Sequence, residues 1–298
     1  MMAELLSAAE LKTQLAHFHQ HFPTEIVKTV TENQGFVHRI LVINDLWICK
    51  IPKDPANTQH SAALAVEAEL LKALQGKLTT PIPVVAYTAP NFLVYQQIPG
   101  TELTAERYAD LSQPQKAQLA HDIAYFLYEL HRALSIAEAK QIGLMFNDWP
   151  WSPAKLIQQA DLLTDPALKK IFTAFIKDYG DPRTVPNITL IHNDMICRNI
   201  IIDPQTGRLS GIIDFTDAAI DDPYIDLRLN YLSVPALSAA IAVNYAQLTG
   251  DMPDLKKIYR YYLATEFSRY LEYLSVQNLT ELPIVKARII QAANYLQL

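Results

Sequence analysis

Apolar and polar positions in the first third of the chain change from a helical to a strand-like period. Residues 4–22 carry apolar side chains at roughly helical spacing before Pro23, which predicts an N-terminal helix. The segments that follow are rich in β-branched and aromatic residues and predict strands, with a helix in the middle. The expected strands are 25–30, 36–43, 46–52, 81–87 and 91–97, and the expected helix is 61–75. Asn44-Asp45 is typical of a hairpin turn, so we expect a mostly antiparallel sheet with one inserted helix.

After the segment 98–103, which contains Pro and Gly, the pattern becomes almost entirely helical. A long amphipathic helix is expected at 115–134, more helix is expected within 153–179, and several helices are expected after Pro235, among them 255–275. Short strands are expected only at 187–194, 199–203 and 209–215. The layout predicts an α+β fold in two domains, a small sheet lobe over residues 1–97 and a larger helical lobe over residues 98–298.

The short strands surround the segment "LIHNDMICRNIIID", residues 190–203, which contains a polar motif between two apolar runs. His192, Asp194 and Asn199 have the spacing H-x-D-x-x-x-x-N, and Asp214 follows the next apolar run. The turn signal "DPQTG" lies between the two runs, so a hairpin would bring Asn199 and Asp214 close together. Taken singly, an Asp in such a loop usually caps a turn and a His before a loop is usually a core residue.

Together these residues match the parts that phosphoryl transfer needs. Amide and carboxylate oxygens suit Mg²⁺, so Asn199 and Asp214 are the expected metal ligands. Asp194 lies just before Asn199 and is placed to accept the proton of an attacking hydroxyl group. The motif therefore predicts an Mg²⁺-dependent kinase that uses a nucleoside triphosphate.

A kinase site also predicts an upstream lysine on a strand that pairs with a glutamate on the next helix. Lys50 lies in the apolar run "WICKIP" and Glu67 lies in the inserted helix, with Glu69 expected to face elsewhere. A lysine at the sheet edge and a solvated helix face are the purely structural interpretations. Gly35 is the one glycine available for a phosphate-covering loop, and a single glycine in a hairpin is commonly just a turn.

Composition and charge narrow the class of protein. The 298 residues are half apolar and carry a formal net charge of −6, which argues against nucleic-acid binding and is compatible with a cationic small ligand. Cys49 and Cys197 lie in apolar surroundings and are expected to be buried free thiols in a reducing compartment. No apolar run is long enough for a membrane span or typical of a secretion signal, so we expect a soluble cytoplasmic protein. The cluster "HFHQH", residues 17–21, is interpreted as a solvated helix end rather than a metal site.

Several segments resemble the aminoglycoside phosphotransferase family, and within it most closely the 2''-O-phosphotransferase group. The segments are "ICKIPK", "VEAELLKAL" with "PIPVV", "FLYELHRAL", "LIHNDMICRNIIID" and "GIIDFTDAAIDDPYIDL". The resemblance implies a eukaryotic-kinase-like fold, with a nucleotide-binding N-lobe and a C-lobe that carries the catalytic loop, metal site and substrate pocket. It implies transfer of the γ-phosphate of GTP or ATP to a hydroxyl group, with an aminoglycoside antibiotic as the first expected acceptor.

The resemblance also assigns roles position by position. Asp194 matches the catalytic aspartate, His192 would support its loop, and Asn199 and Asp214 match the Mg²⁺ ligands. The other matched positions are expected to bind the nucleotide: Lys50 and Glu67 at the phosphates, Gly35 in the covering loop, Tyr95 as gatekeeper, and Gln96, Gln97 and Ile98 in the hinge. Because a bulky gatekeeper in this group disfavours adenine, the resemblance implies that GTP serves at least as well as ATP.

Two departures from the family pattern affect the expected ligands. Asn33 replaces a loop glycine, and the stretch after "DPYID" reads "LRLNYLSVPALSAA", with Arg228 where the group has acids. The remaining candidates for gripping a cationic substrate are acidic: Asp217, Asp221, Asp222, Glu266 and Glu272. A macrolide or a metabolite alcohol such as choline therefore remains a second acceptor hypothesis, and a nucleotide-binding pseudokinase is the hypothesis of another class. The chain is expected to be a monomer or a weak homodimer.

Overall fold

The computed structural model describes residues 5–34, 37–179, 187–228, 234–251 and 254–298. Its chain forms two compact units, which we call the sheet unit (Met1–Gln75 with Pro81–Pro99) and the helical unit (Gly76–Thr80 with Gly100–Leu298). Within the described ranges, no helix is both long and apolar enough to cross a bilayer.

The sheet unit is built on one five-stranded antiparallel sheet with the order β1-β2-β3-β5-β4. Its elements are α1 (Ala8–His21), β1 (Val30–Gln34), β2 (His38–Ile43), β3 (Trp47–Pro52), α2 (Thr58–Leu74), β4 (Val85–Ala89) and β5 (Phe92–Gln96). The predicted antiparallel sheet with one inserted helix is confirmed, and a second helix, α1, belongs to the same unit.

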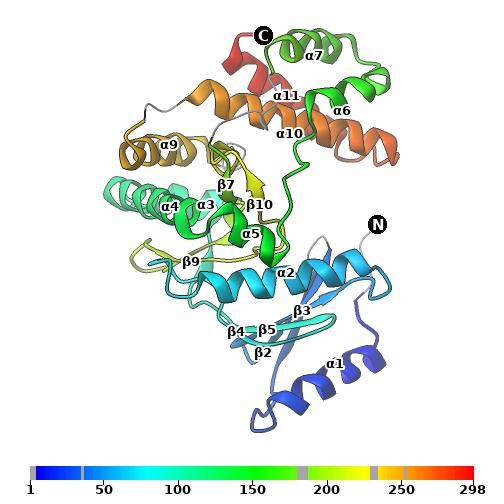
Figure 1. The fold of residues 1–298 in the computed structure, drawn as a ribbon, viewed down its shortest axis with the longest axis vertical. Helices are drawn as coiled ribbons and strands as arrows, with labels where there is room; N and C mark the ends of the chain where they lie inside the picture. Colours follow the sequence, from blue (N-terminus) through cyan, green and yellow to red (C-terminus); the bar gives the residue numbers. More distant parts are fainter. Residues whose placement is uncertain (1–4, 35–36, 180–186, 229–233, 252–253) are drawn as a thin grey trace. The chain divides into compact units, whose positions relative to one another are not determined.

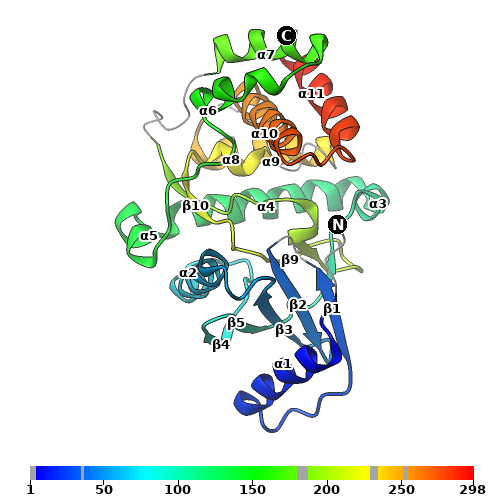
Figure 2. The same ribbon diagram turned by 90° about the vertical axis from the view of Figure 1, so that its right-hand side faces the viewer.

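The two helices of the sheet unit cover opposite faces of the sheet (Figure 2). On one face, Phe18 of α1 is fully buried against Leu41 and Trp47. On the other, Leu64 of α2 packs against Leu93 of β5. The central strand β3 is therefore buried on both sides, and a charged residue placed on it lies in the interior.

The turn between β2 and β3 explains one wrong prediction. Asn44 and Asp45 have φ angles of 57° and 53°, which confirms the predicted hairpin turn. The Asn44 side chain accepts hydrogen bonds from the amides of Lys28 and Thr29 at 2.8 and 3.3 Å. It thereby takes the place of a neighbouring strand, so residues 25–29 stay irregular and β1 begins only at Val30.

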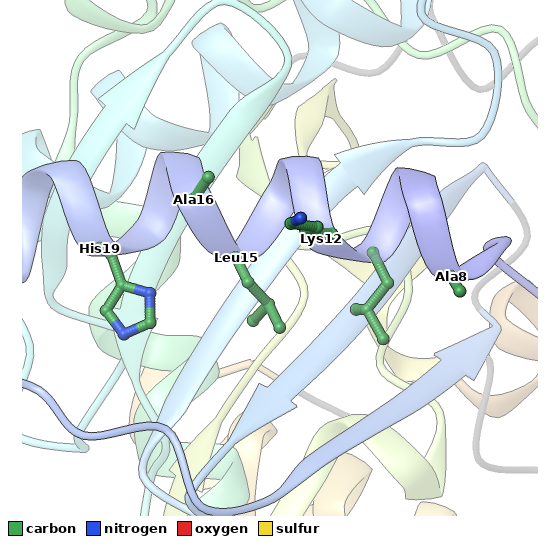
Figure 3. A pocket seen from close by; sticks show the side chains of 6 residues that line it. Ala8, Lys12, Leu15, Ala16 and His19 are labelled. Atoms are coloured by element: carbon green, nitrogen blue, oxygen red, sulfur yellow. The ribbon is translucent and has the colours of Figure 1, made fainter.

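His19 and His21 are exposed, which agrees with the predicted solvated helix end, whereas His17 is half-buried. His17 stacks on Phe92 with ring centroids 4.4 Å apart, and His21 stacks on Tyr87 at 3.7 Å. Burial lowers the pKa of His17, and the nearby His21 acts in the same direction. On another face of α1, an apolar depression is lined by Ala8, Leu11, Lys12, Leu15, Ala16 and His19 (Figure 3). None of the site residues predicted from the sequence belongs to this lining.

The helical unit contains nine α-helices in its described part, with two small sheets and two 3₁₀ turns. The helices are α3 (Ala105–Asp110), α4 (Gln113–Ala133), α5 (Ile136–Ile142), α6 (Pro153–Gln158), α7 (Pro166–Asp178), α8 (Tyr224–Leu227), α9 (Pro235–Thr249), α10 (Leu255–Ser275) and α11 (Leu282–Leu296), of which α8 is a single turn. The 3₁₀ turns are η1 (Ala160–Leu162) and η3 (Cys197–Asn199). In Figure 1, α4 lies beside α9 and α10 lies beside α11.

The short strands of the helical unit form two small antiparallel sheets, β6-β8-β9 and β10-β7. Their bounds are β6 (Thr101–Glu102), β7 (Thr189–Ile191), β8 (Ile200–Ile202), β9 (Leu209–Ile212) and β10 (Ala219–Asp221). The three predicted short strands are confirmed in shorter form as β7, β8 and β9, whereas β6 and β10 were not predicted. The hydrophobic core of this unit includes much of α10, where Tyr262 and Tyr270 are buried.

Candidate active site

The β8–β9 hairpin brings together two of the residues predicted to bind metal. Asn199 directly precedes β8 and Asp214 lies two residues after the end of β9, and Ile200 pairs with Ile212 in the antiparallel ladder. The Ile213 amide donates to the Asn199 carbonyl at 3.0 Å. The turn is held by Asp203, whose carboxylate accepts from two backbone amides of the turn. The adjacency expected from the sequence is therefore present.

Asp214 adopts a left-handed backbone conformation with φ 66°, which is uncommon outside glycine. Its Oδ1 accepts a hydrogen bond from the Thr216 hydroxyl at 2.9 Å. The conformation turns the chain away from β9 immediately after the strand pairing ends. Residues held in such conformations cluster at functional sites.

Asn199 also fixes Asp194. The Asn199 side-chain amide donates to the Asp194 carbonyl at 2.8 Å and to its carboxylate Oδ2 at 2.7 Å. Because both bonds use Nδ2, the amide orientation leaves Oδ1 of Asn199 as the end that can coordinate a cation. One side chain thus orients the predicted base and presents a hard oxygen ligand.

The pKa of Asp194 is raised, mainly because the carboxyl group is buried and partly because Asp214 repels its negative charge. His192, the Asn199 hydrogen bond and Arg198 act in the opposite direction. A carboxylate with a raised pKa is a better proton acceptor than an ordinary aspartate. The environment therefore suits the role of general base.

This arrangement fits a magnesium ion. Asp214 and Asn199 offer hard oxygens, and a cation would relieve the repulsion between Asp194 and Asp214. In the ranges that the structure describes, no three His, Cys, Asp or Glu side chains gather as a metal cluster. Mg²⁺ commonly uses one or two carboxylates and completes its shell with water and phosphate, so it does not need such a cluster.

His192 is buried beneath the loop that carries Asp194. Its Nδ1 accepts the Asp194 amide at 3.3 Å, and its Nε2 donates to the Ile213 carbonyl at 3.1 Å. The ring also packs on Phe215 with centroids 4.6 Å apart. These contacts tie the loop to the end of β9, which is where Asp214 begins its turn.

Asp226 supports the same loop, a role that the sequence analysis did not assign. Its carboxylate accepts from the amides of His192 and Asn193 at 2.8 and 2.6 Å, and from His131 Nε2 at 3.0 Å. Burial alone would raise its pKa, but the hydrogen bond and charge of His131 and the His192 contacts lower it overall. His131 and Asp226 both lie in segments that resemble the family. The sequence signal that could have indicated their role is a polar residue within an otherwise apolar helical stretch.

The sheet unit contains the predicted ion pair. Lys50 Nζ lies 2.9 and 2.7 Å from the two carboxylate oxygens of Glu67, and the two side chains are 2% and 0% exposed. Glu69 instead pairs with Lys72 on the exposed face of α2, as expected. Cys49, next to Lys50, is a buried free thiol, and burial raises its pKa to about 12. The interpretation of Lys50 as a sheet-edge residue is wrong.

The other predicted nucleotide positions also fall in the sheet unit. Tyr95 is buried in β5 beside α2, while Gln96 and Gln97 are exposed at its end. The Gln97 amide donates to the Leu46 carbonyl at 2.7 Å, and Ile98 follows half-buried. Gly35 lies outside the described residues.

Most of the acids predicted to grip a cationic substrate are engaged inside the helical unit. Asp222 is buried and bonded to the Tyr261 hydroxyl and Lys257, and Glu266 is buried beside Arg269 at 2.8 Å. Burial raises the pKa of Asp221 and of Glu266. Two of the five are exposed on the surface, Asp217 and Glu272.

Residues 33–270 match the model of the phosphotransferase enzyme family, which covers most of the chain and every site residue described above except Glu272. The chain belongs to the phosphotransferase enzyme family. The family region begins inside β1 and ends inside α10, so α1 and α11 lie outside it.

Relatives of this phosphotransferase chain are distant in sequence. YcbJ, an uncharacterised protein of Bacillus subtilis (strain 168), is 26% identical over 197 residues, which is 61% of this chain and 61% of that protein. The GDP and kanamycin complex of APH(2")-IIia has a TM-score of 0.77 at 22% identity, covering 95% of this chain and 99% of that one. A macrolide 2'-phosphotransferase type I has a TM-score of 0.71 at 21% identity, covering 96% and 98%. These structures confirm the predicted kinase-like fold.

Replacing Lys50 with methionine should strongly destabilise the phosphotransferase. The substitution leaves the buried Glu67 carboxylate without its lysine, which should lower the free energy of unfolding by roughly 3–5 kcal/mol. The double variant K50M/E67L should recover much of that loss, because apolar pairs often replace buried ion pairs without cost. Urea unfolding measures both effects. K72M, the control, removes the exposed Lys72–Glu69 pair of α2, the helix that carries Glu67. It should lower the free energy of unfolding by less than about 1 kcal/mol, and a K50M variant as stable as K72M would contradict the argument.

Asp226→Asn should loosen the loop that carries Asp194, since an amide cannot accept from three donors as the carboxylate does. We expect a loss of roughly 3–5 kcal/mol at neutral pH. Because the pKa of Asp226 is lowered in the folded state, its stabilisation is present above the ordinary value of 3.8 and is lost as the pH falls through the folded value. The stability difference between wild type and variant should therefore shrink in acid. Asp203→Asn, in the exposed turn, is the control and should change stability much less; equal effects of the two would refute the special role of Asp226.

Proposed function

We propose that this chain is a small-molecule kinase that transfers the γ-phosphate of GTP or ATP to a hydroxyl group. The observation that carries the proposal is the arrangement of Asp194, Asn199 and Asp214: a buried carboxylate with a raised pKa, oriented by an amide and adjacent to a second carboxylate. Phosphoryl transfer relies mainly on positioning and on charge neutralisation, and this arrangement supplies both.

Each residue has a defined part in the proposed reaction. Asp194 accepts the proton of the acceptor hydroxyl as its oxygen attacks phosphorus, and His192 and Asn199 hold it in place. Asn199 and Asp214 would hold Mg²⁺, which when bound supplies charge neutralisation at the phosphates. Lys50, held by Glu67, contacts the phosphates.

Nucleotide binding is assigned to residues 1–97, and the acceptor and metal sites to residues 98–298. Base recognition falls to the backbone of Gln96–Ile98, with Tyr95 as gatekeeper and Gly35 in the covering loop. The Gln97 amide already donates a hydrogen bond to the Leu46 carbonyl. We therefore assign recognition of the nucleotide base to the backbone groups of Gln96 and Ile98. GTP should serve at least as well as ATP.

An aminoglycoside is the first proposed acceptor. The overall fold matches that of a kanamycin complex, and Asp217 and Glu272 are exposed acids that could meet amino groups. A less highly charged alcohol, such as a macrolide or a metabolite alcohol, is the second candidate. One observation favours it: Asp222 and Glu266 already lie beside Lys257 and Arg269, so fewer acids face a substrate than the sequence suggested.

A purified-protein assay tests the proposal by crossing ATP and GTP with aminoglycosides, macrolides and choline in the presence of Mg²⁺. We expect acceptor-dependent release of nucleoside diphosphate with one acceptor class, and mass spectrometry should find the phosphorylated product. Asp214→Ala should remove turnover, and its survival would place the metal elsewhere. Nucleotide binding without turnover on any acceptor would instead support a pseudokinase and overturn the proposal.

Asp194→Asn should separate catalysis from stability. Loss of the base should lower kcat by at least ~100-fold. Because burial raises the pKa of Asp194, its ionisation costs folding free energy, and this cost grows as the pH rises from the ordinary value of 3.8 to the folded value and stays constant above it. The variant should therefore unfold at a higher temperature than wild type at pH 7 without Mg²⁺, measured by calorimetry. Full activity, or a lower melting temperature with intact fold, would show that the base assignment or the electrostatic argument is wrong.

A further inference from the structure

Arg228, the departure from the family pattern that the proposed function leaves unexplained, is one of the most deeply buried large side chains among the described residues. It follows α8 directly and is 1% exposed. Its guanidinium donates to Thr265 Oγ1 at 2.9 Å, to the Ile225 carbonyl at 2.8 Å and to Asn193 Oδ1 at 3.1 Å. The fork therefore joins α10 and α8 to the residue immediately before Asp194.

Arg228 remains a cation in this position. Burial lowers its pKa to about 10, while the charges of Asp226, Asp221 and Asp194 act in the opposite direction. The three hydrogen bonds go to neutral oxygens rather than to a carboxylate. A buried charge of this kind is weak evidence for stability, because apolar residues of similar size are often as stable. Its contacts therefore point to a role in placing other groups.

Asn193 is the group that Arg228 places. Its φ of 67° is left-handed, a conformation that costs a residue with a side chain some free energy. Its side-chain amide donates to Asn147 Oδ1 at 3.2 Å and to the Asp217 carbonyl at 3.1 Å. Its Oδ1 accepts from Arg228 and, at 3.4 Å, from Asn147. Both ends of the amide are thus engaged, which selects one side-chain orientation.

The position of Asn193 makes these contacts relevant to the reaction. A rotation at its backbone moves the next residue, Asp194, whose carboxylate must lie within hydrogen-bond reach of the acceptor hydroxyl. A displacement of about 1 Å can lower the rate roughly 100-fold. The backbone amide of Asn193 donates to Asp226 Oδ1 at 2.6 Å, which fixes its main chain, and Arg228 fixes its side chain.

We propose that Arg228 is a positioning residue for phosphotransfer, which holds the left-handed Asn193 through its side-chain oxygen and thereby places Asp194. The inference rests on the proposed function, because placement matters only if Asp194 acts as the base. It assigns Asn193 and Asn147 to the same network, with Asn147 bracing the amide from the segment before α6.

A double-mutant cycle with R228K, R228M and N193G tests the inference. Lysine keeps the charge but loses the three-pronged fork, and glycine keeps the left-handed backbone while removing the side chain that Arg228 holds. We expect R228K to lower kcat by ~10–100-fold. KM for nucleotide and acceptor should change less than about threefold, because only placement of the base is altered. N193G should lower kcat to a similar extent. The kcat of the double variant N193G/R228K should be no lower than that of the less active single variant.

Several outcomes would overturn it. Losses that multiply in the double variant would show that Arg228 does not act through Asn193, as would full kcat in N193G. A change confined to KM or to melting temperature would reduce Arg228 to a structural residue. If R228M does not fold, R228K and N193G alone still decide the question.

Lys286→Met, which removes the Lys286–Asp165 pair of the same unit, is the control and should lower melting temperature while leaving kcat unchanged. A wild-type protein inactive with every nucleotide and acceptor would refute the proposed function itself, whereas an active wild type with additive losses would refute only this inference.

Discussion

The Asp226 carboxylate is the interaction on which the candidate site of the helical unit depends. It is buried and accepts hydrogen bonds from two consecutive backbone amides of the loop that carries Asp194 and from His131 of α4. Three segments that are far apart in sequence therefore meet at one negative charge. A buried carboxylate that loses its donors costs several kcal/mol, so none of these segments can shift without a large penalty. The location of Asp194 follows, because it is the next residue after the second of those amides.

Backbone strain and hydrogen bonding balance each other at two positions of the site. Asn193 and Asp214 both adopt left-handed conformations, one just before the predicted base and the other at a predicted metal ligand. Such conformations persist only where the surroundings over-determine them. At Asn193 the surroundings are Asp226, Arg228 and Asn147, whereas at Asp214 the Thr216 hydroxyl is bonded to the carboxylate. A relaxed backbone at either position would aim its functional group elsewhere, so the strain is consistent with a requirement of the chemistry.

The sequence was informative where the signal is local and silent where it depends on distant partners. The β8–β9 hairpin could be predicted because its turn lies between two apolar runs, and the Lys50–Glu67 pair because a lone charge on a buried strand needs a partner. The start of β1 could not be predicted, since a side chain sixteen residues away, Asn44, competes for the backbone of Lys28. Arg228 stood out only as a departure. Its bonds to Thr265 and Asn193 span more than thirty residues each, which no spacing rule encodes.

The charge of a pocket cannot be inferred by counting acids along a chain. The net charge of −6 is compatible with a cationic ligand, yet Asp222 lies beside Lys257 and Glu266 beside Arg269 within the helical unit. A carboxylate already neutralised by a neighbouring cation offers a polycationic substrate little additional attraction, because binding it would require breaking or sharing an existing pair. Arg228 lies buried behind the loop that carries Asp194, and the negative charges of Asp226, Asp221 and Asp194 favour its charged form. A cationic substrate would therefore have to bind acids other than Asp222 and Glu266, and Asp217 and Glu272 are the exposed candidates.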